Sequence, residues 1–235
     1  MTDKPLSNRT ALVTGASRGI GAATAEALAE QGAHVILVAR TAGGLEEVEE
    51  RIHAAGGSAT IAPLDLTDGE SIDRLAQAIA GRWPALDILV LNAAMLGTLA
   101  PVAALDAKEF SKLLTLNVGA QAALIAAFDP LLKASDRGRL LGITSTVAQS
   151  PRAYWGAYGA SKAAFENLMF AHGQEVANIS AIRTAILNPG ATATKMRANA
   201  YPGEDPATLK TPAVVGTAIA KLLVQDFETG ATITL

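Results

Sequence analysis

Cysteine is absent from this sequence of 235 residues, and no metal-binding pattern stands out in it. Without cysteine the chain forms no disulfide and no thiolate metal site, although the absence fixes no cellular compartment. The three histidines, His34, His53 and His172, lie far apart and lack the spacing of metal ligands. We therefore expect no metal site, and we interpret these histidines as packing or surface residues.

Aromatic residues and long apolar runs are also scarce. Aromatic residues make up 4% of the chain and hydrophobic residues 50%, which favours helices packed closely on a sheet over an aromatic-rich β-sandwich. The longest apolar stretch, 113–128, is interrupted by Asn117, Gly119 and Gln121 and is too short and too polar to predict a membrane span. The first ten residues lack the apolar segment of a signal peptide. We expect a cytoplasmic protein without a membrane partner.

A concentration of positive charge is missing too. The 19 basic and 22 acidic residues give a net charge of −3, and no basic run is longer than a dipeptide. Nucleic-acid binding proteins usually present a basic patch or stripe to the phosphate backbone. The sequence therefore predicts no nucleic-acid partner.

Short apolar runs alternate with longer amphipathic segments along the whole chain. The predicted strands are 11–14, 34–39, 58–64, 86–92, 139–144, 180–188 and 230–235. The predicted helices are 19–32, 41–55, 67–83 with Thr67 as N-cap, 106–133 bounded by Pro130 and the polar residues after it, and 155–176. Strands that are apolar throughout and alternate with helices indicate a parallel sheet covered on both faces. We predict one α/β domain, 1–235, with a doubly wound, Rossmann-type sheet of seven parallel strands.

One polar segment, about 191–211, departs from this alternation. It contains Pro202 and Pro206 and follows directly after a predicted strand. In open α/β sheets ligands bind at the carboxyl ends of the strands, and long insertions there often act as lids. We interpret 191–211 as a substrate lid, with an ordinary surface loop as the alternative.

A glycine-rich turn, Thr14–Gly21, follows the first predicted strand. Its glycines, Gly15, Gly19 and Gly21, stand where the chain turns into the first helix. Glycine there permits a tight turn, close approach of backbone to a pyrophosphate and close packing of helix on strand. The helix N-terminus then offers free N–H groups to the phosphates. The turn predicts a dinucleotide site.

The end of the second strand indicates which dinucleotide binds. An NAD site usually has an acidic residue there, but this strand ends at Arg40 and the next acid is Glu46. The guanidinium groups of Arg40 and Arg18 suit a 2′-phosphate, so we expect NADP(H) to be favoured over NAD(H). Asp65, after the third strand, is placed either to accept a hydrogen bond from the adenine amino group or to cap a helix.

A tyrosine and a lysine four residues apart, Tyr158 and Lys162, share one face of a predicted helix, with Ser145 thirteen residues upstream. A tyrosine pKa near ~10 makes a poor base, and lowering it to about 7 takes roughly 4 kcal/mol of phenolate stabilisation. A nearby ammonium, a nicotinamide cation and partial desolvation supply this together. Tyr158 would then exchange a proton with a carbonyl or alcohol oxygen while Ser145 stabilises charge on that oxygen.

These features together resemble the short-chain dehydrogenase/reductase family, in its single-domain branch of about 250 residues. The resemblance runs from about Arg9 to Leu235. Its motifs occur here as Thr14–Gly21, Asp65-Leu66, Asn92-Ala93, Asn117, Ser145, Tyr158 with Lys162, and Pro189-Gly190 followed by Thr194. Two features differ from the family pattern: Ala94 replaces a glycine after Ala93, and the sequence stops soon after the last strand.

The resemblance implies a catalytic set and a cofactor site. Ser145, Tyr158, Lys162 and Asn117 would be catalytic, with the Asn117 backbone holding a water that links Lys162 to solvent. A polar break inside a long helix is the competing interpretation of Asn117. The implied cofactor-binding residues are Gly15, Ser17, Arg18, Gly19, Ile20, Gly21, Arg40, Asp65, Leu66, Asn92, Ala93, Tyr158, Lys162, Pro189, Gly190, Thr192 and Thr194.

We therefore expect an NADP(H)-dependent oxidoreductase that reduces a small-molecule carbonyl compound or oxidises the corresponding secondary alcohol. A 3-oxoacyl thioester reductase is one alternative, although only Lys195, Arg197 and Lys210 lie near the lid to meet a carrier protein. A catalytically silent NADP-binding sensor or scaffold is another. A serine hydrolase is disfavoured because Ser161 falls inside a helix rather than on a strand-to-helix elbow.

The resemblance also implies a homodimer or homotetramer. Family members pair two long helices, here about 106–133 and 155–176, into a four-helix interface. Many alanines in both segments permit close approach of a second subunit, and they equally suit packing on the protein's own sheet.

Overall fold

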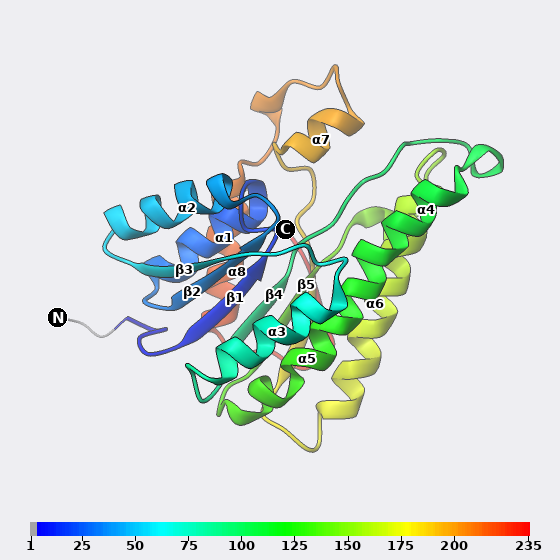
Figure 1. The fold of residues 1–235 in the computed structure, drawn as a ribbon. Helices are drawn as coiled ribbons and strands as arrows, with labels where there is room; N and C mark the ends of the chain where they lie inside the picture. Colours follow the sequence, from blue (N-terminus) through cyan, green and yellow to red (C-terminus); the bar gives the residue numbers. More distant parts are fainter. Residues whose placement is uncertain (1–3) are drawn as a thin grey trace.

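A single parallel sheet runs through the computed structural model, which describes residues 4–235 (Figure 1). The strand order is β3-β2-β1-β4-β5-β6-β7, and every neighbouring pair is parallel. Strand β1 lies inside the sheet, where Val13 pairs with Leu37 of β2 on one side and with Val90 of β4 on the other. This confirms the predicted Rossmann-type fold; the first three residues of the predicted domain 1–235 lie outside the described range.

The strands fall close to their predicted places. They are β1 (Thr10–Thr14), β2 (His34–Ala39), β3 (Ser58–Pro63), β4 (Ile88–Leu91), β5 (Arg139–Ile143), β6 (Arg183–Asn188) and β7 (Ala231–Thr234). The helices are α1 (Gly19–Glu30), α2 (Ala42–Ala54), α3 (Gly69–Ala80), α4 (Ala107–Leu114), α5 (Ala120–Ala134), α6 (Gly156–Val176), α7 (Lys195–Ala200) and α8 (Pro212–Val224).

Two apolar layers bury the two faces of the sheet. Helices α1, α2 and α8 cover one face, where Leu28 and Ile219 belong to the same cluster as Val13 of β1. Helices α3, α5 and α6 cover the other, where Phe128 and Phe165 join Leu12. Successive residues of a strand point to opposite faces, so a strand buried on both sides is apolar at every position.

Helix α3 begins later than the sequence predicts, and Thr67 as its N-cap is wrong. Asp68 is the N-cap, and its carboxylate accepts a hydrogen bond from the backbone N–H of Ser71 at 3.4 Å. Thr67 instead bonds backwards along the chain: its N–H and hydroxyl donate to the carboxylate of Asp65 at 2.9 and 2.8 Å. The polar segment 65–68 therefore forms a turn before the helix starts.

The predicted helix 106–133 is continuous but not uniform. A π-helical turn, Thr115–Gly119, joins α4 to α5, and Pro130 lies inside α5 rather than at its boundary. Proline removes the bond that residue 130 would donate to the carbonyl of Ala126. Ala126 is exposed, so water can take the place of that donor.

The stretch Ala107–Ala134 is also longer and more apolar than the interrupted run suggests. Its 28 residues are long enough to cross a membrane, and an 18-residue window within them has a mean hydropathy of 1.3. Leu124, Phe128 and Leu132 of this stretch are, however, completely buried against the sheet. It is a core helix of the fold.

Two helices do not figure among the predicted elements. The proposed lid contains the short helix α7, capped by Thr194, and α8 follows it, capped by Thr211 with Pro212 in its first turn. A threonine followed by proline before an apolar segment is a helix-start signal that the sequence displays. Helix α8 packs closely on α1, because a Cβ on Gly216 would lie 2.5 Å from the backbone of Ala23.

Candidate active site

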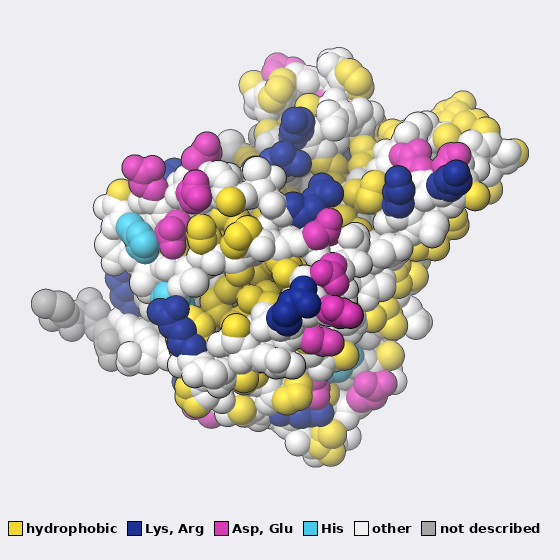
Figure 2. Space-filling model, viewed as in Figure 1, with side chains coloured by type: hydrophobic (Ala, Val, Ile, Leu, Met, Phe, Trp, Pro, Cys, Tyr) yellow, Lys and Arg dark blue, Asp and Glu magenta, His cyan; other side chains and the backbone are white. Residues whose placement is uncertain are grey.

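The predicted site residues gather at one edge of the sheet. Gly15 follows β1, Asn92 follows β4, Ser145 follows β5 and Pro189 follows β6. Because all seven strands are parallel, these segments share the carboxyl edge, above which α7 projects (Figure 1). Lys and Arg side chains collect below the lid, and a separate apolar patch lies farther down this face, between α2 and α3 (Figure 2). The basic side chains at this edge suit an anionic ligand.

The glycine-rich turn has the backbone that the sequence predicts. Gly15 and Gly19 adopt φ values of +66° and +58°, which residues other than glycine rarely adopt. Gly21 has no room for a side chain, since a Cβ there would lie 2.2 Å from the carbonyl oxygen of Gly15. Helix α1 begins after Arg18 without a side-chain cap and without acidic residues in its first turn. Its N–H groups are therefore available to a phosphate, and the turn fits a dinucleotide.

The sequence reasoning missed how Thr14 and Asn92 stabilise this turn. The hydroxyl of Thr14 accepts hydrogen bonds from the N–H groups of Asn92 and Ala93 at 3.0 and 3.1 Å and donates to the carbonyl of Val90. The side-chain amide of Asn92 in turn donates to the carbonyl of Thr14 at 2.9 Å. Both side chains are thus committed to joining the ends of β1 and β4, and they shape the glycine-rich turn from below.

The residues expected to bind the adenosine half of the cofactor follow the ends of β2 and β3. Arg40 and Arg18 are exposed, and within residues 4–235 neither makes an ion pair. Asp65 stands close enough to Arg40 for that charge to help hold its pKa below the usual range, although the hydrogen bonds from Thr67 are the larger cause. The interpretation of Asp65 as a helix cap is wrong, because Asp68 caps α3 and Asp65 accepts from Thr67 in the turn before that helix. The residue after Asp65, Leu66, is buried in the core.

Tyr158 and Lys162 lie near the start of α6, and both are almost completely buried. The ammonium group of Lys162 donates to the carbonyl of Ile143, the last residue of β5, at 2.8 Å. It stands 5.9 Å from the centre of the Tyr158 ring. Burial lowers the pKa of Lys162 to about 8, partly opposed by the negative charge of Glu166. Helix α6 therefore places an ammonium group that is more acidic than that of an ordinary lysine near a phenol.

One expectation about Tyr158 is not met by the protein alone. Burial raises the pKa of its phenol, whereas the sequence reasoning expects a lowered value. The ammonium of Lys162 bonds a backbone carbonyl instead of the phenol, so desolvation prevails over charge attraction. Tyr158 is thus fully protonated at neutral pH, which is the state of a proton donor.

Ser145 opens a short 3-10 turn, Thr146–Ala148, directly after β5. Gly159 of α6 allows this turn to come close, because a Cβ there would lie 2.8 Å from the carbonyl oxygen of Val147. The side chain of Asn188, at the end of β6, donates to the hydroxyl of Thr146 at 2.9 Å. Ser145 is therefore fixed between the start of α6 and the end of β6.

Asn117 occupies the π-helical turn between α4 and α5 and is 1% exposed. Its side-chain oxygen accepts from the N–H of Met95 and its amide donates to the Met95 carbonyl, both at 2.9 Å. The amide also donates to the hydroxyl of Ser161 at 3.0 Å. Asn117 thus interrupts the regular helix, as its interpretation as a polar break predicts, and its side chain joins this interruption to the helix carrying Tyr158.

Ser161 is no nucleophile. It is completely buried within α6, and its hydroxyl donates to the backbone carbonyl of Tyr158 at 2.7 Å. A hydrolase serine must be exposed on a sharp turn. The structure therefore argues against the serine-hydrolase alternative.

The proposed lid is joined to the edge at both of its ends. Thr192 is buried and pairs with Lys210 in an isolated β-bridge, and Gly190 adopts a φ of +66°. The hydroxyl of Thr194 accepts from the N–H of Arg197, so it caps α7. Its methyl group would lie 3.6 Å from a Cβ on Gly19, which puts the start of the lid against the glycine-rich turn.

Aromatic contacts tie the lid to α6, and the sequence reasoning did not identify them. The ring of Tyr201 lies 5.7 Å from that of Trp155, which in turn meets Tyr158 edge-on at 6.0 Å. The guanidinium of Arg197 stands 3.8 Å from the centre of the Tyr201 ring and forms a two-pronged ion pair with Glu204, at 2.6 Å for each bond. The lid therefore has internal structure of its own.

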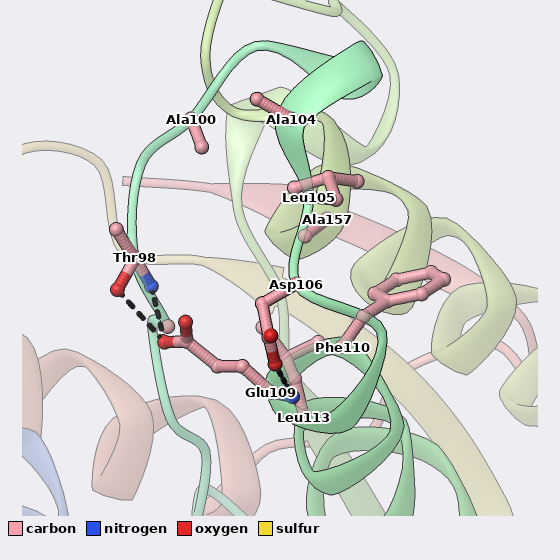
Figure 3. A pocket seen from close by; sticks show the side chains of 10 residues that line it. Thr98, Ala100, Ala104, Leu105, Asp106, Glu109, Phe110, Leu113 and Ala157 are labelled. Atoms are coloured by element: carbon pink, nitrogen blue, oxygen red, sulfur yellow. Dashed lines mark hydrogen bonds between the residues drawn. The ribbon is translucent and has the colours of Figure 1, made fainter.

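A cavity of about 100 Å³ lies beneath the loop between β4 and α4 (Figure 3). Phe110 and Leu113 of α4 and Ala157 of α6 contribute to its wall. Glu109 closes one side, where its carboxylate accepts from the N–H and hydroxyl of Thr98 at 2.7 and 2.9 Å. This small cavity is therefore adjacent to Ala157, the residue that precedes Tyr158.

Among residues 4–235 no group of His, Asp and Glu side chains has the arrangement of a metal site. His34 bonds Ser58 and Thr60, and His172 bonds Asp129 at 3.0 Å. These two histidines pack between secondary-structure elements, as the sequence suggests.

Comparison with known proteins identifies this arrangement. The model of the short chain dehydrogenase family matches residues 9–205. The oxidoreductase YciK of Escherichia coli (strain K12) is 40% identical over 211 residues, which cover 88% of this chain and 83% of that protein. A short chain dehydrogenase from Pseudomonas syringae has a TM-score of 0.95 at 37% identity, over 99% of this chain and 96% of that one. One from Shigella flexneri, crystallised with NADP, has a TM-score of 0.92 at 38% identity over 99% of both chains.

The fold and these relatives define an oxidoreductase of the Rossmann type. The chain belongs to the short-chain dehydrogenase/reductase family, as its motifs predict.

Proposed function

We propose that this protein is an NADP(H)-dependent carbonyl reductase, able to oxidise the corresponding secondary alcohol in the reverse direction. The observation that supports this most strongly is the buried pair of Tyr158 and Lys162 at the same edge of the sheet as a glycine-rich turn in which Gly21 has no room for a side chain. Burying an ammonium opposes stability, so its presence next to a protonated phenol supports a catalytic role for the pair rather than a structural one.

The choice of NADP(H) rests on charge at the end of β2. Arg40 and Arg18 are exposed and without ion-pair partners in residues 4–235, and a 2′-phosphate would supply the missing anion. The Shigella flexneri relative was crystallised with NADP, which supports the same preference. The remaining proposed cofactor contacts come from the turn (Gly15, Ser17, Gly19, Ile20, Gly21), from Asp65, Leu66, Asn92 and Ala93, and from Pro189, Gly190, Thr192 and Thr194 after β6.

When bound, NADPH supplies the hydride that reduces the carbonyl carbon. Tyr158 is protonated and gives its proton to the carbonyl oxygen, so the product is a neutral alcohol. Ser145 donates a hydrogen bond to the same oxygen as negative charge develops on it. Lys162 stabilises the phenolate that remains, and the turn containing Asn117 connects α6 with the loop after β4. In the alcohol-oxidising direction the same groups act in reverse order.

The structure gives little support to a thioester reductase that docks an acidic carrier protein. Of the basic residues near the lid, Arg197 is paired with Glu204 and the ammonium of Lys210 donates to the carbonyl of Leu235. Lys195 is left as a single free cation among these three. A free small molecule in the cytoplasm is therefore the substrate we propose.

We further propose a homodimer or homotetramer formed through α4, α5 and α6. These helices run side by side along one edge of the molecule, and apolar side chains follow that edge (Figures 1 and 2). Ala126, Ala160 and Ala163 are exposed there, so a second copy can approach closely. Sedimentation at twice or four times the chain mass would support this interface, and a monomer would contradict it.

The decisive experiment follows NADPH and NADH oxidation with a panel of ketones, aldehydes, diketones and oxoacyl thioesters. Tyr158→Phe removes the proton donor, and Tyr154→Phe makes the same change at a neighbouring exposed tyrosine. We expect turnover with NADPH that Tyr158→Phe lowers by about a hundredfold or more and that Tyr154→Phe leaves intact. NADPH binding without turnover by the unmodified protein would instead favour the sensor or scaffold.

A further inference from the structure

Glu166 is a buried acid that the proposed reaction has not used so far. It lies one helical turn after Lys162 in α6 and is 6% exposed. One carboxylate oxygen accepts a hydrogen bond from the hydroxyl of Thr144 at 2.6 Å, and the other accepts from the side-chain amide of Gln149 at 3.1 Å. Charged residues are rarely buried to this degree without a reason, because removing a carboxylate from water is costly.

The two donors stand at either end of the segment that contains Ser145. Thr144 immediately precedes Ser145, and Gln149 ends the 3-10 turn that Ser145 begins. A single carboxylate therefore holds both ends of this segment against α6. The same helix holds Tyr158, so Glu166 joins the serine to the tyrosine through one rigid element.

Glu166 also faces the charge of Lys162. The groups around that ammonium are the carbonyl of Ile143, the rings of Tyr158 and Phe165, and the carboxylate of Glu166. Tyr158 is neutral at ordinary pH, so Glu166 provides the negative charge. Its effect on the pKa of Lys162 opposes that of burial. Without it, the ammonium would lose its proton more readily.

We propose that Glu166 is a positioning residue with two separable roles: it fixes the Ser145 segment on α6, and its charge keeps Lys162 protonated. This inference rests on the proposed reductase function, because both roles act on groups of that reaction. Thr144 and Gln149 take part in the first role, because they donate the hydrogen bonds that Glu166 accepts. None of the three touches the reacting atoms in this scheme.

Two substitutions at Glu166 separate the roles. Glu166→Gln keeps the length and can still bond Thr144 and, after rotation of one amide, Gln149, but it has no charge. Glu166→Asp keeps the charge and shortens the reach. Thr144→Val removes one hydrogen bond without touching any charge. The variants therefore form a matched set, and Thr144→Val remains informative if either change at Glu166 prevents folding.

The first readout is the titration of Lys162 by NMR of isotope-labelled lysine, with its signal assigned from its absence in Lys162→Arg. It needs neither cofactor nor substrate, so it stands even if the proposed reaction proves wrong. We expect Glu166→Gln to move the titration to lower pH, and Glu166→Asp and Thr144→Val to leave it close to that of the unmodified protein. An unchanged titration in Glu166→Gln would overturn the charge role.

The second readout is the pH profile of turnover with the best substrate of the panel. Glu166→Gln should lose activity several-fold more at pH above 8 than at neutral pH. Glu166→Asp and Thr144→Val should lower kcat about tenfold at every pH, because a small displacement of Ser145 weakens its contact with the reacting oxygen. Unchanged kcat in both variants would overturn the positioning role. Absence of turnover in the unmodified protein would instead contradict the proposed function.

Discussion

Gly21 of α1 lies so close to Gly15 that a Cβ on Gly21 would stand 2.2 Å from the Gly15 carbonyl oxygen and 2.5 Å from the side-chain amide of Asn92. Contacts this short with backbone cannot be relieved by rotating a side chain. The glycine-rich turn and the first helix are therefore pressed together, and the N-terminus of α1 reaches the position where a pyrophosphate would bind.

Gly21→Ala should consequently affect both stability and cofactor binding. We expect a loss of about 1–3 kcal/mol in the free energy of unfolding, measured with urea, since the turn must shift to admit the methyl group. NADPH affinity, measured by fluorescence, should fall with it. The control is Gly43→Ala in the first turn of α2, where a Cβ would meet nothing within 4 Å. That change should keep or slightly raise stability; equal effects of the two changes would contradict the steric argument.

Lys162→Met should remove activity and raise stability. The pKa of Lys162 is about 8 in the folded protein against an ordinary value of 10.5, because burial disfavours the charged form. The folded state thus carries an electrostatic penalty that is fully present below pH 8 and disappears as the pH rises towards 10.5. At pH 7 we expect the variant to gain about 2 kcal/mol after loss of the bond to Ile143.

The check on Lys162→Met is thermal unfolding across the alkaline range. The unmodified protein should gain stability relative to the variant as the pH rises from 8 to 10.5, so the difference between the two should shrink. A difference that stays constant over this range would show that the ammonium carries no such penalty.

Arg40→Asp should change the cofactor preference. Loss of a charged hydrogen bond to a 2′-phosphate costs about 1.5–3 kcal/mol, which lowers kcat/KM for NADPH roughly ten- to a hundredfold. An acid at this position suits a ribose hydroxyl, so kcat/KM for NADH should rise. Arg82→Asp makes the same change of charge after α3, at the opposite edge of the sheet, and should alter neither value. Equal losses in the two variants would attribute the effect to overall charge.

The sequence predicted the sheet and the helix that carries Tyr158 and Lys162 well because their signals are local. Most of the strands are short, largely apolar runs, and the spacing of Tyr158 and Lys162 places both on one face of α6 whatever packs around them. The strand order and the shared carboxyl edge then follow from the family resemblance and from parallel pairing. What could be predicted is thus the set of groups and the edge at which they meet.

Other features were missed because a competing partner decides them, and in two of the three cases that partner is distant in the sequence. Thr67 looked like a helix cap, but the carboxylate of Asp65 competes for it. An ammonium, a nicotinamide cation and partial desolvation are together expected to lower the pKa of Tyr158. In the structure the carbonyl of Ile143 takes the ammonium, and burial raises that pKa. Glu166 carries no motif at all, and its role emerges only when Thr144 is brought to it.

Tyr201→Ala should free the lid from α6. The ring contacts both Trp155, at 5.7 Å, and the guanidinium of Arg197, at 3.8 Å. An aromatic pair and a cation–π contact contribute about 2 kcal/mol together, so their loss should raise the open population roughly thirtyfold. Trypsin should then cleave after Lys195 and Arg197 correspondingly faster, and KM for a carbonyl substrate should rise more than kcat falls.

The matched control is Tyr201→Phe, which keeps the ring and removes only a hydroxyl whose bond from Arg152 is 3.4 Å long. It should be cleaved at nearly the rate of the unmodified protein, because a bond of this length at an exposed site contributes little. If Tyr201→Phe opened the lid as far as Tyr201→Ala does, the hydroxyl rather than the ring would hold the lid. Arg152, at the start of the segment leading into α6, would then be the group through which the lid is joined to that helix.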